Sequence, residues 1–101
     1  MAIKLKEKDV RKVNYYEPIE IANGITLKMS RFIEGKDVQL ICTAVTKDKD
    51  GKETELGKAD ISTTSNHLYV QVFPVSELGA EKTMNLAGTL LEALTTMFKA
   101  D

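Results

Sequence analysis

Cysteine, histidine, proline and tryptophan are scarce in this sequence, and their scarcity excludes several classes of protein. The chain of 101 residues has one cysteine, one histidine, two prolines and no tryptophan. Because Cys42 has no partner for an internal disulfide, a disulfide-stabilised secreted domain is excluded. One histidine and one cysteine leave only scattered carboxylates as further metal ligands. We therefore expect neither a bound metal nor another cofactor.

Long apolar runs and an excess of one charge are also missing. No segment approaches the roughly 18 apolar residues of a membrane-spanning helix, and no N-terminal stretch has the pattern of a signal peptide. The 14 basic and 15 acidic residues give a formal net charge of -1. The chain as a whole therefore has no global attraction to nucleic acid or anionic lipid. We expect a cytoplasmic protein that does not contact a membrane.

The period of the apolar residues changes at Pro74, and this change predicts the fold class. In residues 19–73 apolar and polar residues alternate between turn signals such as Asn23-Gly24 and Asp50-Gly51, which is typical of antiparallel strands. After Pro74 the apolar residues recur at three- and four-residue spacing, as in a helix. We predict a single α+β domain over residues 1–101. It has an irregular N-terminal segment (1–16), an antiparallel β-meander of about five strands (17–74) and one long C-terminal helix (76–99) packed on one face.

The stretch KDKDGKETE, residues 47–55, superficially resembles a calcium loop of the EF-hand type. With Gly51 at the sixth position, Thr46 and Gly57 occupy the first and twelfth, where carboxylate ligands belong. A hairpin is the better interpretation. A two-residue turn at Asp50-Gly51 pairs Leu40 with Ile61, Cys42 with Ala59 and Ala44 with Gly57, so that one apolar face results.

The same reasoning at Ser65-Asn66 pairs Ile61 with Val70, and at Gly35-Lys36 it pairs Ile33 with Val38. The core face thereby extends to Val38 and Leu68, among others. The helix is expected to cover it, with bulky Leu91, Leu94 or Phe98 over the small strand residues Ala44, Gly57 and Ala59. A first stripe of the helix holds Met84, Ala87, Leu91, Leu94 and Phe98, and a second stripe of Leu86, Leu90, Ala93 and Met97 widens it. Gly88, in the middle of the helix, costs about 1 kcal/mol relative to alanine.

The opposite face of the sheet is mixed rather than polar. It is predicted to carry a candidate interaction face of Phe32, Ile41, Val45, Leu56, Tyr69 and Phe73. An apolar patch of several hundred Å² usually has a partner. Ile19 and Ile21 join this face if Asn23-Gly24 is a two-residue turn, and the resulting conflict indicates a bulge or a different register in the first strand.

Two coverings of the mixed face are open at this point. The N-terminal 16 residues could fold over it with Ile3, Leu5, Val10, Val13, Tyr15 and Tyr16, or a homodimer could bury it, since two-fold self-association is the commonest oligomer. The leading functional hypothesis is a small cytoplasmic interaction or structural module that self-associates through this face. The alternative is single-stranded nucleic-acid binding, in which Phe32, Tyr69 and Phe73 stack bases beside Lys28 and Lys58.

Catalytic chemistry has little support in the sequence. The predicted register places His67 beside a turn on the mixed face, whereas Cys42 points to the helix side, so no Cys-His pair forms. Asp60 lies on the mixed face between Ile41 and Gln71. No glycine-rich phosphate loop is present. We expect no catalytic residue and no enzyme activity. An enzyme would need a cleft that contains His67 or Asp60.

Overall fold

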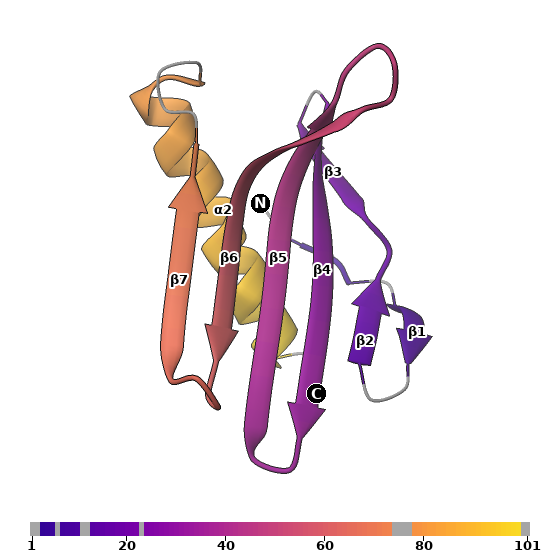
Figure 1. Ribbon diagram of the computed structural model, residues 1–101, viewed down its shortest axis with the longest axis vertical. Coiled ribbons are helices and arrows are strands. Elements are labelled where there is room, and N and C mark those ends of the chain that lie inside the picture. The colour runs from indigo at the N-terminus through magenta and orange to yellow at the C-terminus, as the bar shows by residue number, and fades with distance from the viewer. Residues whose placement is uncertain (1–2, 6, 11–12, 23, 74–77, 100–101) are drawn as a thin grey trace.

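The structure, a computed structural model, describes residues 3–5, 7–10, 13–22, 24–73 and 78–99. It has the predicted α+β fold, with one antiparallel sheet and a C-terminal helix on one face (Figure 1). The strands are β1 (Glu7–Val10), β2 (Val13–Tyr16), β3 (Ile19–Ala22), β4 (Ile25–Glu34), β5 (Asp37–Lys47), β6 (Glu53–Ser62) and β7 (His67–Val72), and the helix is α2 (Ala80–Lys99).

The predicted meander is formed by β3 to β7, but the sheet has seven strands because the N-terminal segment adds two. Residues 1–16, expected to be irregular, contain β1 and β2, and β2 pairs with residues 30–32 of β4. Strand β4 has 10 residues, while β3 covers only residues 25–27 of its edge. Backbone groups on that edge need hydrogen-bond partners, and β2 pairs with residues 30–32.

The hairpin between β5 and β6 keeps the predicted pairs but not the predicted turn. Leu40 lies opposite Ile61 and Ala44 opposite Gly57, as expected. A bulge then shifts the register, so that Lys47 pairs with Glu53 around a loop of residues 48–52. Within that loop, the carboxylate Oδ1 of Asp48 accepts the backbone N–H groups of residues 50 and 52, each at 2.9 Å. The acidic loop residue thus stabilises a turn.

Two other registers differ from the two-residue turns that the sequence suggested. Between β6 and β7, Ile61 lies opposite Leu68 rather than Val70, because the connection spans residues 63–66. A shift of two residues leaves every side chain on its predicted face. In β3 a bulge between Glu20 and Ala22 brings Ile19 opposite Leu27, so Ile19 packs against the core. This confirms the bulge interpretation of the first strand.

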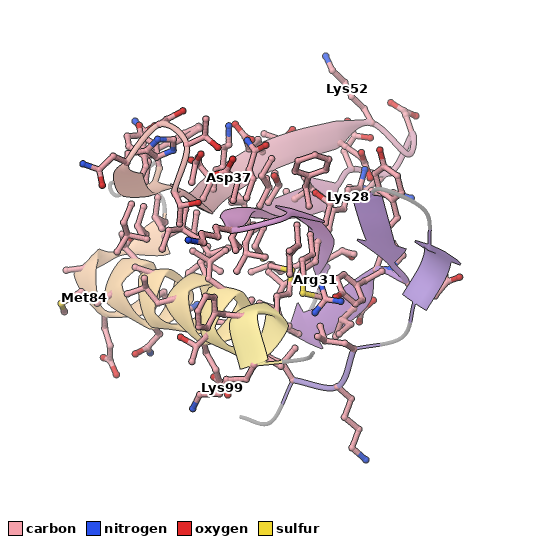
Figure 2. All side chains as sticks on the ribbon, turned by 90° about the horizontal axis from the view of Figure 1, so that it is seen from below. Lys28, Arg31, Asp37, Lys52, Met84 and Lys99 are labelled. Carbon is pink, nitrogen blue, oxygen red and sulfur yellow. The ribbon has the colours of Figure 1, made fainter. Side chains whose placement is uncertain are left out.

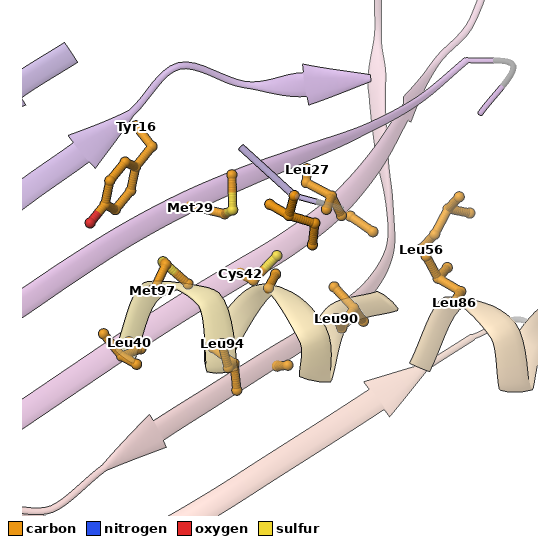
Figure 3. Packing of buried hydrophobic residues seen from close by; sticks show 14 residues of the cluster. Tyr16, Leu27, Met29, Leu40, Cys42, Leu56, Leu86, Leu90, Leu94 and Met97 are labelled. Atoms are coloured by element: carbon orange, nitrogen blue, oxygen red, sulfur yellow. The ribbon is translucent and has the colours of Figure 1, made fainter. Parts of the chain in front are cut away.

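The core lies between the sheet and α2 and contains the second helical stripe (Figure 3). Leu86, Leu90, Ala93, Leu94 and Met97 are the buried residues of the helix. Leu90 lies over Gly57, where an added Cβ would be 3.3 Å from its Cδ1 atom. Of Leu91, Leu94 and Phe98, which were expected to cover the small strand residues, only Leu94 is buried in the core, while Leu91 and Phe98 are exposed and Leu90 lies beside Gly57.

Both ends of α2 have identifiable contacts. The helix begins at Ala80, after Gly79, whose positive φ of 84° suits glycine, and the proposed start at residue 76 lies outside the described residues. At the other end, Arg31 of β4 reaches the last turn (Figure 2), where its Nη1 donates to the carbonyl oxygen of Met97 at 3.4 Å. A cation at a helix C-terminus interacts favourably with the helix dipole.

Candidate interaction surfaces

The described part of the N-terminal segment does not cover the mixed sheet face. Ile3 and Tyr16 are buried in the core on the helix side, and Leu5 packs against that core. Tyr15 lies opposite Ser30 and is 50% exposed. The side chains of Val10 and Val13 lie outside the described ones. Instead of folding over the mixed face, the described part of this segment extends the sheet and fills the helix side.

Leu56 is the one candidate residue that leaves the mixed face altogether. It occupies the bulge in β6, between Glu55, which pairs with Val45, and Gly57, which pairs with Ala44. An extra residue in one strand turns the following side chains to the other face. Leu56 is therefore buried in the helix-side core, where it lies close to Leu86 (Figure 3). Its placement on the mixed face was wrong, because a strictly alternating register has no bulge.

Val45 remains on the mixed face but is only 6% exposed. Lys28 of β4 and Glu53 of β6 form an ion pair across β5, the strand that carries Val45. The side-chain hydrogen bond from Lys28 holds the pKa of the Glu53 carboxyl below its usual value. The aliphatic part of a lysine covers apolar surface while its ammonium group stays in water. Lys28 is therefore paired within the chain, and Val45 is buried, so that neither is left for a partner.

The remaining candidates on this face are dispersed. Phe32 and Ile41 are half-buried, and Ile41 lies opposite Ser30 and Asp60. Tyr69 and Phe73, at the β7 edge, are exposed. Phe32 is three strands from β7 in the sheet order, roughly 14 Å at the usual strand spacing. The aromatic side chains do not form one stacking platform.

The charged groups beside Tyr69 are paired with one another. The Nζ atom of Lys58 lies 3.7 Å from Oδ2 of Asp60, and the His67 ring contacts Oδ1 of the same carboxylate through Nε2. Tyr69 donates its hydroxyl hydrogen to Oε1 of Gln71. Both lysines of the nucleic-acid hypothesis, Lys28 and Lys58, thus have a carboxylate partner.

A cavity of about 320 Å³ beside the β6–β7 turn is lined by His67 and by the hydroxyl residues Ser62 and Thr63, among others. Its lining includes Ser62, whose Oγ accepts the backbone N–H of Ser65 at 3.1 Å. Cys42 is buried on the other side of the sheet, and desolvation raises the pKa of its thiol to about 12. His67 contacts Asp60, and in the described part of the chain neither Ser62 nor Thr63 hydrogen-bonds to the imidazole ring, as the nucleophile of a catalytic triad would. Among the described residues, no three His, Cys, Asp or Glu side chains cluster as metal ligands would.

Four exposed apolar side chains lie on the helix side, where sequence analysis expected core. Leu68 of β7 and Met84, Leu91 and Phe98 of α2 are 59%, 67%, 41% and 58% exposed. They belong to the predicted core face and to the first helical stripe. The signal for this surface was present in the sequence, because α2 is apolar on more of its circumference than one sheet contact buries.

An apolar groove runs between α2 and the end of the sheet. This α2–β7 groove has a volume of about 240 Å³ and is lined mainly by Leu40, Ile61, Leu68, Leu91, Leu94 and Phe98. Figure 1 shows that the C-terminal half of α2 diverges from β7. No described helix has the length and apolar character to cross a bilayer. Comparison with known proteins adds no further guide, since no family model, curated protein or solved structure matches the chain.

Proposed function

We propose that this protein is a small interaction module that self-associates, and that the outer surface of α2 is the part that a second polypeptide covers. The observation that supports this is the second apolar stripe of the helix. One stripe packs on the sheet, while Met84, Leu91 and Phe98 of the other are exposed. A helix that is apolar on two sides is typical of one that packs against two surfaces.

The outer α2 surface is favoured over the mixed sheet face for three physical reasons. Leu56 has left the sheet face, Val45 is buried, and Ile41 lies opposite the polar residues Ser30 and Asp60. Docking on that face would also desolvate paired charges, which costs more than removing water from leucine and phenylalanine. We retain the cytoplasmic location as part of the proposal, together with the absence of enzyme activity.

Light scattering across a dilution series tests the proposal. We expect a dimer that dissociates on dilution, and the double variant Leu91→Gln/Phe98→Gln should be monomeric. Burial of each such side chain is worth about 1.5–3 kcal/mol, or roughly a tenfold or greater change in the dissociation constant. Ile41→Gln is the matched control on the sheet face and should leave the dimer intact.

Three results would contradict the proposal. A wild-type monomer at all concentrations would remove self-association. A dimer that is broken by Ile41→Gln but not by the α2 variant would return the interface to the sheet face. Salt-sensitive binding of a single-stranded oligonucleotide by a monomer, lost in Tyr69→Ala/Phe73→Ala, would favour the nucleic-acid function instead.

A further inference from the structure

The two edges of the sheet differ in how well they are protected against another strand. Strand β1, at one edge, has the sequence EKDV, in which three of the four residues are charged. Strand β7, at the other edge, has the sequence HLYVQV, which contains no Lys, Asp, Glu, Pro or Gly. Edge strands are usually protected from pairing by charge, proline or short length. In the described part of the chain, β7 combines high β-propensity with an unpaired edge.

The backbone groups that β7 presents at this edge follow from its pairing with β6. Phe73 donates its backbone N–H to the carbonyl oxygen of Leu56 at 2.8 Å. Since successive residues of a strand direct their backbone groups to opposite sides, those of Tyr69 and Gln71 also point to β6. The N–H and C=O groups of Leu68, Val70 and Val72 therefore point away from the sheet.

The open edge adjoins the apolar surface of α2. Leu68 belongs both to β7 and to the α2–β7 groove, which also contains Leu91 and Phe98. Met84 extends from the N-terminal half of α2 on the side where β7 ends the sheet (Figures 1 and 2). A strand that pairs with β7 would thus lie beside both exposed parts of the helix.

We infer that a second copy of this chain binds at this edge, with its β7 antiparallel to the first, so that the two sheets become continuous. This inference rests on the proposed self-association and specifies its geometry. With Val70 of each copy at the two-fold axis, Leu68 lies opposite Val72 of the partner subunit. On the other face Tyr69 lies opposite Gln71 of the partner subunit, so no like charges meet.

The two-fold arrangement also fills the groove. The partner strand runs in the opposite direction, so its C-terminal end lies beside Leu68. Because α2 begins close to the C-terminal end of β7 (Figure 1), the partner's Met84 is brought to the α2–β7 groove. A cavity of about 150 Å³ holds a benzene molecule, so a groove of about 240 Å³ has room for an unbranched methionine side chain.

The available area is of the size that a dimer needs. Besides the helix residues and Leu68, Tyr69 at the same edge is 46% exposed. A fully exposed large side chain has an accessible area of roughly 150–250 Å². The exposed fractions of Leu68, Tyr69, Met84, Leu91 and Phe98 then give about 400–700 Å² of exposed side-chain area per copy. A stable interface covers about 800 Å² per partner, and the backbone edge of β7 supplies the rest. We choose a second copy as the partner because the surface is self-complementary. The strand that pairs with β7 is another β7, and the side chain that fits the α2–β7 groove is another Met84.

Amide hydrogen exchange of the full chain, measured by NMR at concentrations above and below dimer dissociation, tests this geometry. The amides of Tyr69 and Gln71 should be protected in both states because they bond to β6. Those of Leu68, Val70 and Val72 should be protected in the dimer and exchange rapidly in the monomer. This alternation is specific to pairing at the strand edge.

Substitution of Met84 gives an independent test, because its exposed side chain contributes little to the monomer fold. Each dimer contains two methionine contacts, so Met84→Gln should weaken association by about a hundredfold or more. Met84→Leu should retain the dimer, and Lys82→Gln, on the same turn of the helix, should have no effect.

The outcomes separate this inference from the proposed function. A dimer in which the amides of Leu68, Val70 and Val72 exchange rapidly, or in which Met84→Gln binds as wild type, overturns the β7 geometry and leaves self-association standing. A protein that is monomeric at every concentration overturns both the β7 geometry and the proposed self-association.

Discussion

Replacing Gly57 by alanine tests how closely β7 and α2 approach β6. A Cβ atom at this position would lie 2.8 Å from the carbonyl oxygen of Gln71, 3.2 Å from Cγ2 of Val72 and 3.3 Å from Cδ1 of Leu90. The shortest contact is with the backbone of β7, which has no rotamer that could relieve it. The strands or the helix must therefore move, and overpacking of this kind costs roughly 1–3 kcal/mol.

An opposing effect has to be subtracted from this cost. Alanine restricts the unfolded chain more than glycine does, which stabilises the folded state by roughly 0.4–1 kcal/mol. Gly57 is not among the residues with positive φ, so alanine brings no backbone strain of its own. The steric cost is the larger, and we expect the free energy of unfolding to fall by about 1–2 kcal/mol. In a domain of this size Tm falls by roughly 4–16 °C.

Gly88→Ala is the matched control, because it is the same chemical change with the opposite expected sign. A Cβ atom at Gly88 would meet nothing within 4 Å, and alanine in mid-helix is favoured over glycine by about 1 kcal/mol. Urea unfolding followed by far-UV circular dichroism measures the free energy of unfolding of both variants, at a concentration where the chain is monomeric. A Gly57→Ala protein as stable as wild type would refute the close approach of β7 and α2 to β6.

Three further predictions concern single side chains. Burial raises the pKa of the Cys42 thiol from 9.0 to about 12, so the unfolded state loses its proton first, and stability should fall by about 1.4 kcal/mol per pH unit between those values. Cys42→Ala should remove this slope from denaturant unfolding curves. Lys28→Met should return the lowered pKa of the Glu53 carboxyl toward 4.5 in an NMR titration, and an unchanged value would contradict the ion pair. Asp48→Ala removes the acceptor for two loop N–H groups and should lower the free energy of unfolding by about 1 kcal/mol, whereas Ca²⁺ should not change Tm.

Side-chain alternation was sufficient to predict which face most strand residues occupy. A slip of one residue between β5 and β6 would have placed Lys58 or Asp60 in the core, so the pairs of Leu40 with Ile61 and Cys42 with Ala59 were strongly specified. A slip of two residues leaves each side chain on the same face of the sheet, so the apolar pattern does not distinguish the two registers. For this reason the β6–β7 register was predicted two residues away from the one observed.

The rotation of α2 could not be predicted from its own sequence, because two stripes of similar apolar character compete for the sheet. The deciding feature lies in the strands. Ala44, Gly57 and Ala59 form a shallow area where the helix backbone comes close, and Leu90 and Ala93 fit it. Phe98 is too large for so close an approach, whereas Leu91 has the same size as Leu90, and the sequence of the helix alone does not distinguish these two leucines.

The same rotation explains why the candidate surface moved from one side of the molecule to the other. The bulge at Leu56 transfers a large apolar side chain from the sheet face to the core, where it lies close to Leu86. With the second stripe buried, Met84, Leu91 and Phe98 of the first stripe are left exposed together with Leu68. Apolar surface lost from the sheet face is thus matched by apolar surface exposed beside β7. Because β7 is also the edge without Lys, Arg, Asp or Glu, the helix and the strand together present a surface that a second β7 and its Met84 would complement.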